Sequence, residues 1–235
     1  MTAIALPRQR YSAWRDKLRS IQLGLGARGA VGLGLGESEP AAVGSGTDWS
    51  TWFGHFYDMK NAASQAASYL DLVGSQNWAV GTAPTWSSGT GLTFDGSTQY
   101  LSLGITLPAN ATVLVRFSGS ANGGAMFGER TSGQRIGCYM TSPTQFYNGN
   151  GNKTVTTSTA GVIGISDRTG YFNGAPVVTS LPAWSVTPSS VFALGAMFES
   201  VAFSFWSGNV QAVGIKIGAL SGAQVAAATA EMAAL

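Results

Sequence analysis

The chain has 235 residues, of which 45% are hydrophobic and 11% aromatic, and only 10% are charged. An average soluble protein has about 25% charged residues, and disordered chains combine high charge with few aromatic residues, so we expect a folded chain with an uncharged polar surface. The 32 glycines indicate short strands joined by tight turns. The single cysteine, Cys138, excludes an intrachain disulfide, and the absence of a long apolar run predicts no membrane span.

The N-terminal 28 residues form a basic segment with six arginine or lysine residues and one acid, Asp16. Apolar residues spaced by three and four positions predict a helix over residues 7–22. A helix of this length is marginal alone, so we expect it to anchor on another subunit or protein. Packing on the chain's own body and lying on a membrane surface are the alternatives. The predicted anchoring residues are Arg8, Arg10, Tyr11, Trp14, Arg15, Lys17, Leu18, Arg19 and Ile21.

Residues 23–36 alternate with a period of two residues, with glycine at most even positions. This pattern predicts an extended strand that adds to the sheet of a neighbouring chain, with a flexible glycine-rich linker as the alternative. Residues 37–47 have no periodicity and contain Pro, Gly and Ser, which is typical of a linker. We therefore divide the chain into a basic docking arm, 1–47, and a body, 48–235.

The body shows recurrent strand-like runs with turn residues between them and no long helices. Asp95-Gly96 and Asn173-Gly174 each predict a hairpin turn. Ser221 and Gln224 have the spacing of a capping box and begin an alanine-rich helix over 221–234. The pattern predicts an all-β, two-sheet antiparallel sandwich with a short C-terminal helix.

Four segments of the body resemble one superfamily in its own order. Asp71–Asn77 resembles the turn that opens many laminin-G-like, concanavalin-like lectin and glucanase domains, and Gly91–Leu101 resembles their "FDG" strand pair. Residues 170–175 resemble the "NG" hairpin, and 205–225 resemble the closing strand and helix. The resemblance covers roughly residues 57–235 and implies a jelly-roll sandwich. That fold hosts lectins, glycosidases, adhesion modules and virion parts.

The acidic residues of the body are widely separated in sequence, whereas glucan-cleaving members of this superfamily carry clustered carboxylates on one strand. His55 is the sole histidine, and we expect it to pack among aromatic neighbours. We therefore predict that the chain is not an enzyme, with a glycosidase as a remote alternative. No metal and no cofactor are expected, because calcium needs several clustered oxygen ligands.

Glycan binding would use exposed aromatic rings beside amides, although most aromatic residues in a sandwich lie in the core. Tyr147 has asparagines nearby at 148, 150 and 152. Nucleic-acid binding is not expected, because the body is not basic. The candidate glycan-contacting residues are Trp78, Trp86, Tyr147, Asn148, Trp184 and Trp206.

The combination of a concanavalin-like body with a docking arm predicts a structural protein on the exterior of a phage or phage-like particle, such as a head fibre, decoration protein or tail appendage. We expect a homo-oligomer, with a trimer favoured, that is anchored on a capsid or tail protein through the arm and contacts host surface glycans. The alternative is a free-standing carbohydrate-binding or adhesion module.

Overall fold

The computed structural model describes residues 47–120, 123–142 and 144–235. The predicted helix over 7–22, the extended segment 23–36 and the linker up to residue 46 lie outside the described residues. Among the helices that the structure describes, none is long and apolar enough to cross a membrane.

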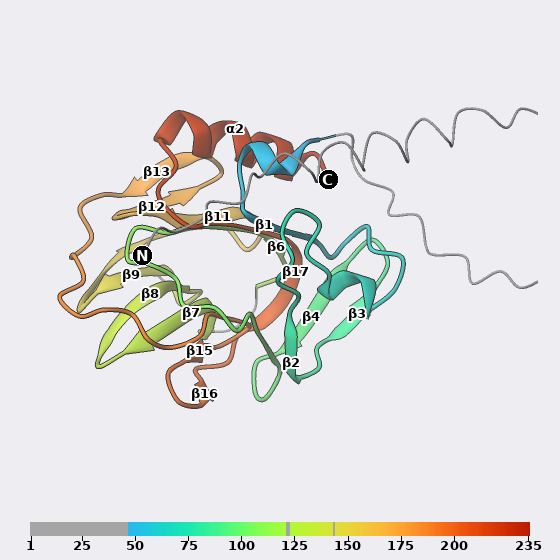
Figure 1. Cartoon of the computed structure of the whole chain (residues 1–235), viewed down its shortest axis with the longest axis horizontal. Coiled ribbons are helices and arrows are strands. Elements are labelled where there is room, and N and C mark those ends of the chain that lie inside the picture. The colour runs from blue at the N-terminus through green and yellow to red at the C-terminus, as the bar shows by residue number, and fades with distance from the viewer. Residues whose placement is uncertain (1–46, 121–122, 143) are drawn as a thin grey trace, which may run out of the picture. The chain divides into compact units, whose positions relative to one another are not determined.

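The body consists of two facing β-sheets, which confirms the predicted all-β antiparallel sandwich (Figure 1). Sheet A has the order β13-β12-β11-β6-β17-β4-β3, with β1 also paired to β17. Its strands are β1 (His55–Asp58), β3 (Thr85–Ser87), β4 (Gly91–Asp95), β6 (Thr112–Ser118), β11 (Gly161–Ser166), β12 (Thr169–Phe172), β13 (Ala175–Val178) and β17 (Ser207–Lys216).

Sheet B has the order β10-β9-β8-β7-β14-β5-β2, and two short strands, β15 and β16, are attached at β7. Its strands are β2 (Ala79–Thr82), β5 (Tyr100–Ser102), β7 (Ala125–Thr131), β8 (Gln134–Tyr139), β9 (Thr144–Gly149), β10 (Gly151–Val155), β14 (Ala193–Leu194), β15 (Met197–Phe198) and β16 (Ala202–Phe203). Two 3-10 turns, η2 (Trp49–Thr51) and η3 (Ala67–Tyr69), and one helix, α2 (Gly222–Ala233), complete the described elements.

The main core lies between the two sheets. Alternate residues of a strand point to opposite faces, and Val113, Val115 and Phe117 of β6 meet Phe127 and Phe146 of sheet B there. Cys138 is fully buried in this core, as expected of a small apolar residue. The sandwich is therefore held together by ordinary apolar burial from both sheets.

A second apolar cluster lies on the outer side of sheet A. Helix α2 begins at the predicted capping box, in which Ser221 and Gln224 each bond the other's backbone N–H. Its buried residues Val225 and Met232 pack with Phe56 and Leu114 in a cluster separate from the main core. The helix consequently covers the part of the outer face of sheet A that β6, β11 and β13 form (Figure 1).

One of the two predicted hairpins is confirmed and the other is wrong. Asn173 and Gly174 both have positive φ and join β12 to β13, as a two-residue turn of type I′ requires. Asp95-Gly96 instead carries the chain from sheet A to sheet B, because β4 pairs with β17 and β5 pairs with β14. Asp95 accepts bonds from the backbone N–H groups of residues 97–99, which turns the chain out of its sheet.

Glu129 of β7 is a fully buried carboxyl side chain. Its Oε2 accepts a hydrogen bond from the backbone N–H of Leu107 at 3.1 Å, and within the described ranges its Oε1 has no partner. Burial raises the pKa of Glu129 to about 8, against the lowering effect of the Leu107 hydrogen bond. The carboxyl is therefore neutral at pH 7 in the folded chain.

We predict that Glu129 makes the body less stable as pH rises. The unfolded chain ionises this group near 4.5 and the folded chain near 8, so the unfolded state binds fewer protons between these values and the free energy of unfolding falls through this window. Glu129→Gln, which keeps an acceptor for Leu107, should remove on the order of 4 kcal/mol of this fall. Urea denaturation at pH 4, 6 and 8 measures it.

The matched control is Glu231→Gln, which removes a partly exposed carboxyl from α2 and should keep the fall with pH. An unchanged slope in the Glu129→Gln variant would show that the carboxyl ionises in the folded chain as it does in water.

Candidate functional site

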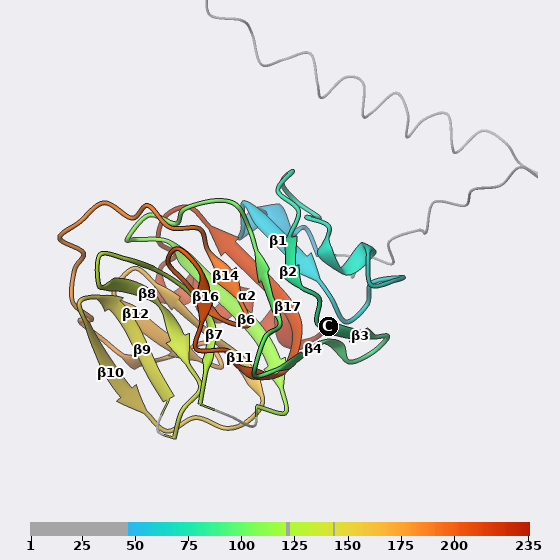
Figure 2. The ribbon, with the colours of Figure 1, turned by 90° about the horizontal axis from the view of Figure 1, so that it is seen from below.

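The outer face of β8, β9 and β10 carries a group of aromatic, cationic and amide side chains. Ile136, Cys138 and Phe146 of these strands point into the core, so the alternate positions point outward. Figure 2, viewed from below, shows the three strands side by side. The outward side chains that form this group, here called the tyrosine patch, are Arg135, Tyr139, Gln145, Tyr147 and Asn152.

Tyr147 is the centre of the tyrosine patch. Its ring lies 5.0 Å from the ring of Tyr139, at an interplanar angle of 54°. The guanidinium carbon of Arg135 lies over the same ring, 4.8 Å from its centroid. Gly137 is the register partner of Tyr147 and lies between Arg135 and Tyr139 in the sequence, so it leaves space for all three side chains. The arrangement combines a tilted contact between two rings with a cation–π contact.

Hydrogen bonds fix the position of the central ring. The Tyr147 hydroxyl donates to Gln145 Oε1 at 2.6 Å, and Asn152 Nδ2 donates to the same oxygen at 3.2 Å. Asn152 is exposed, and the other four side chains of the tyrosine patch are partly exposed. The patch is thus an ordered surface that presents ring faces, amide groups and a guanidinium to solvent.

A second layer borders the tyrosine patch. A Cβ atom added to Gly137 would lie 3.0 Å from Met197 Cε, so the Met197 side chain of β15 reaches the glycine that faces Tyr147. Phe203 of β16 lies under the guanidinium of Arg130, 5.9 Å from ring centroid to guanidinium carbon. Arg130 also forms an ion pair with Glu199 at 3.7 Å. The tyrosine patch is therefore bounded on one side by β15 and β16.

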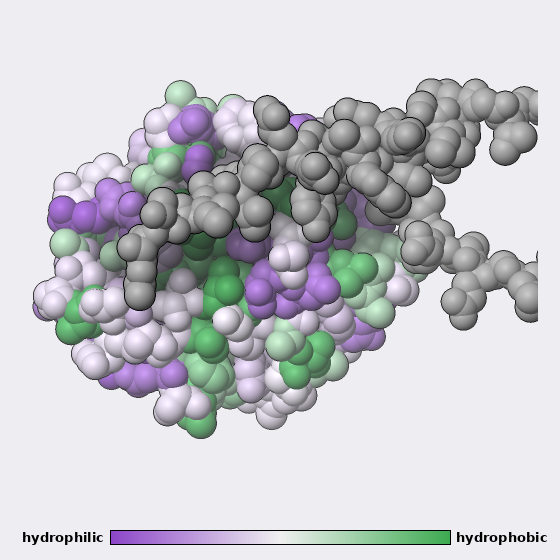
Figure 3. Space-filling view, in the orientation of Figure 1, coloured by the Kyte–Doolittle hydropathy of each residue, from purple (hydrophilic) through white to green (hydrophobic). Residues whose placement is uncertain are grey.

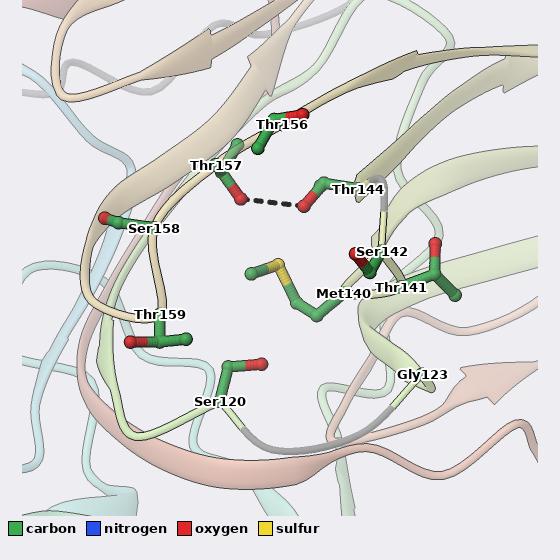
Figure 4. Close-up of a pocket in the computed structure, with 10 residues that line it drawn as sticks. All are labelled: Ser120, Gly123, Met140, Thr141, Ser142, Thr144, Thr156, Thr157, Ser158 and Thr159. Atoms are coloured by element: carbon green, nitrogen blue, oxygen red, sulfur yellow. Dashed lines mark hydrogen bonds between the residues drawn. The ribbon is translucent and has the colours of Figure 1, made fainter.

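A polar pocket of about 400 Å³ opens at the rim of the sandwich, where β8 ends and β9 begins (Figure 4). Met140 extends into it, and the hydroxyls of Thr144 and Thr157 bond each other across one side at 2.7 Å. Among the described residues, its lining contains hydroxyl groups and a thioether but no charged or aromatic side chain. The lining residues are Ser120, Gly123, Met140, Thr141, Ser142, Thr144, Thr156, Thr157, Ser158 and Thr159.

Of the six residues predicted to contact a glycan, only Tyr147 belongs to the tyrosine patch. The structure places Trp78, Trp206 and Asn148 in the buried interior, where the apolar rings contribute to the core and a glycan does not reach them. Asn148 points inward and donates to the carbonyl of Asp167 at 2.6 Å. The neighbouring asparagine that does face outward is Asn152.

The remaining two candidates are partly exposed but lie elsewhere. Trp86 packs against the main core and donates its Nε1–H to the carbonyl of Met59 at 2.8 Å. Trp184 also packs against the core and lines a shallow depression of about 670 Å³ with residues 106–109 and 185–188. In the part of the chain that the structure describes, neither ring has a second aromatic or cationic neighbour of the kind that surrounds Tyr147.

Carboxylates of the body accept hydrogen bonds from nearby groups of the chain, and Asp71 is the main example. Asp71 accepts hydrogen bonds from His55 Nδ1 at 2.7 Å and from the backbone N–H groups of Phe56, Val73 and Gly74. Burial raises the pKa of Asp71, but these hydrogen bonds lower it further, so the pKa lies below its ordinary value. In residues 47–120, 123–142 and 144–235, no group of three or more His, Cys, Asp or Glu side chains could hold a metal ion.

Sequence reasoning did not identify Arg135, Tyr139 and Gln145. A signal for the first two was present, because the apolar Ile136 and Cys138 alternate with Arg135 and Tyr139, whereas residues 144–149 show no such alternation. Counting from the buried Phe146 places Gln145 and Tyr147 on the opposite face. The cross-strand neighbours could not be found in this way, because they depend on the register of β8 against β9.

Comparisons with solved structures reveal the same fold in carbohydrate-related proteins. Trypanosoma rangeli sialidase in complex with sialic acid matches 77% of this chain with a TM-score of 0.54 and 14% identity. This chain covers 33% of that chain, or about a third of its length. Domain 4 of AbnA, a GH43 extracellular arabinanase from Geobacillus stearothermophilus, in complex with arabinotriose, matches 75% of this chain and 98% of its own, with a TM-score of 0.53 and 14% identity.

No protein-family model matches the sequence, and no curated protein matches it either. At 14% identity the likeness to the two solved structures concerns the fold. It supports the two-sheet sandwich of the predicted resemblance, whereas the phage placement gains no support from it.

The prediction that the chain is not an enzyme is wrong. It rested on the wide separation of the carboxylates in the sequence, but the solved structures that share the fold are sialidase and GH43 arabinanase chains. The fold is thus associated with glycosidases. Wide separation of carboxylates in the sequence does not argue against catalysis, because residues that are distant in the sequence of a sandwich meet in space.

We predict that Gln145 holds the tyrosine patch in place. Gln145→Ala removes the acceptor shared by the Tyr147 hydroxyl and Asn152, and because the site is partly exposed the free energy of unfolding should fall by only about 1 kcal/mol. The side-chain amide resonances of Asn152 should shift in NMR spectra, while those of the buried Asn148 stay in place. Unchanged Asn152 resonances would contradict the shared hydrogen bond.

Proposed function

We propose that the body of this chain is a carbohydrate-binding domain and that its glycan lies on the tyrosine patch. The observation that carries the proposal is the cluster of Tyr147, Tyr139 and Arg135 on the outer sheet face that α2 does not cover. A sugar presents apolar C–H groups on its ring faces and hydroxyls on its edge. Exposed aromatic rings bury the former, while the amides of Gln145 and Asn152 bond the latter.

The fold comparison supports this assignment. The arabinanase domain that matches the chain over 98% of its own length was solved in complex with arabinotriose, so a domain of this fold is compatible with an oligosaccharide ligand. The rim pocket is a weaker candidate for the primary site than the tyrosine patch, because its described lining residues offer hydroxyls but no aromatic face.

The surface composition fits the same interpretation. Figure 3 shows one face of the molecule on which pale, weakly polar residues lie between scattered strongly hydrophilic and hydrophobic ones. Charged residues make up 10% of the chain. A surface of hydroxyls and amides suits neutral hydrogen bonding to sugar hydroxyls, which need both donors and acceptors.

We predict that a glycan array with wild-type chain identifies ligands and that Tyr147→Ala weakens their binding by about tenfold or more, as loss of a central ring contact does. Tyr147→Phe, which keeps the ring, should retain most of the affinity. Trp52→Ala, which removes a partly exposed ring packed on the α2 side, should leave it unchanged. Isothermal titration calorimetry measures the affinities.

Equal affinities for wild type and Tyr147→Ala would move the site away from the tyrosine patch. An assay for new reducing ends on the same glycans separates binding from cleavage. Cleavage of the bound glycan would assign the chain as a glycosidase and replace the binding-domain proposal.

A second candidate function places this glycan site on the exterior of a phage or phage-like particle, as an appendage anchored by the arm. The observation that favours it is the charge of the arm, where six basic residues in the first 28 stand against one acid. A basic arm of this kind suits docking on an acidic partner such as a capsid or tail protein. The localisation and the trimer are parts of this proposal.

We predict that the full chain is an oligomer and that a chain starting at Thr47 is a folded monomer. Light scattering after size exclusion measures both masses. Two monomers of equal stability would remove the assembly role of the arm and leave the free-standing carbohydrate-binding module.

A further inference from the structure

Two arginines lie side by side across β7 and β8. Arg130 and Arg135 are register partners, and both lie on the outer face of sheet B. Each guanidinium rests on an aromatic ring, Arg130 on Phe203 at 5.9 Å and Arg135 on Tyr147 at 4.8 Å. Like charges directly opposite each other on adjacent strands destabilise a sheet. A pair held in this position therefore calls for compensating negative charge.

Only one of the two cations has an acidic partner among the described residues. Arg130 pairs with Glu199 at 3.7 Å, whereas Arg135 has no carboxylate within 4.0 Å in the described ranges. The one acid within β7 to β10 is Glu129, whose side chain is buried and whose pKa is raised to about 8 by that burial. The outer face of these strands thus keeps one uncompensated positive charge, at the tyrosine patch.

The guanidinium of Arg135 is also free to bind. Within the described residues it makes no hydrogen bond to the protein, so its contact with Tyr147 occupies a face of the group and leaves its N–H donors at the edge. A planar guanidinium presents these donors in a fork that matches the two oxygens of a carboxylate or the oxygens of a sulfate. The group is held beside the ring on which we propose that a sugar stacks.

We infer that the glycan of the tyrosine patch is acidic, with a carboxylate or sulfate group that pairs with Arg135 while an adjoining sugar ring stacks on Tyr147. This inference rests on the proposed carbohydrate-binding function and specifies its ligand class. A carboxylate or a sulfate supplies oxygens that accept hydrogen bonds from the N–H groups of the guanidinium. The anion takes the place of the carboxylate partner that Arg130 has and Arg135 lacks.

The test compares three probes of equal length on the full chain by calorimetry. They are an oligogalacturonate, the same oligomer with its carboxyl groups reduced to neutral alcohols, and a sulfated form of that neutral oligomer. We expect at least one acidic probe to bind tenfold or more tightly than the neutral one, and which of the two does so distinguishes a carboxylate from a sulfate ligand. Arg135→Gln should remove this preference, so that this variant binds the acidic and the neutral probes with equal affinity.

Two variants control for charge that is not at the site. Lys216→Gln removes one positive charge from sheet A, and Arg15→Gln removes one from the arm, and both should keep the acidic preference. Arg135→Lys keeps the charge but loses the fork, so it should recover only part of the preference. Thermal melts of each variant confirm that it is folded.

The failures are distinguishable. Equal binding of all three probes by wild type, or a loss in Arg135→Gln that is the same for neutral and acidic probes, would overturn the acidic ligand and keep the binding domain. Loss of the preference in Arg15→Gln and its retention in Arg135→Gln would assign it to the arm and overturn the inference. Absence of glycan binding of every kind, both here and on the array, would overturn the proposed function itself.

Discussion

A two-sheet sandwich has two outer faces, and the burial of an apolar cluster under α2 removes part of one of them from solvent. Phe56, Leu114 and Val225 meet on the outer side of sheet A, so the middle of that sheet is buried on both faces, while β4 keeps exposed residues at its edge. Sheet B has the main core on one side and a mixed polar and aromatic surface on the other. The position of the candidate site depends on this asymmetry, because the site requires ordered strands whose outer face stays accessible.

The tyrosine patch is built on strands and not on loops, which makes its geometry rigid. Side chains on β8 and β9 are spaced by the pleat and the register, so the ring of Tyr147 meets its neighbours on two diagonals without a specialised loop. Gln145 on the same strand holds the hydroxyl of that ring. A ligand would therefore meet a surface that is already arranged, and little ordering entropy is lost on binding.

Much of the fold followed from local chemistry. The α2 cap, the Asn173-Gly174 turn and the inward face of β6 are set by residues close in the sequence, and each was predictable. The hairpin predicted at Asp95-Gly96 was wrong, because the local turn signal is the same whether the chain returns to its own sheet or crosses to the other one. Which outcome occurs depends on partners more than a hundred residues away, such as the pairing of β4 with β17.

The candidate site was predictable only in part, for the same reason. Tyr147 stood out as an aromatic residue near amides, but the outward direction of Asn152 and the inward direction of Asn148 depend on a count that starts from a known core position. The buried Trp78 and Trp206 look the same as surface tryptophans in a sequence. Composition cannot separate the two roles, because sandwich cores and sugar sites both use large rings.

The scarcity of charge in the body has a consequence for its behaviour in electrolytes. In the described residues, Arg130 and Glu199 form the one pair between a carboxylate and an arginine or lysine side chain, and apolar burial dominates the stability. Added salt screens charges and leaves apolar packing in place at moderate ionic strength. The folded body should hence be nearly indifferent to ionic strength, which makes salt titration a selective reporter of whatever charged partner the molecule meets.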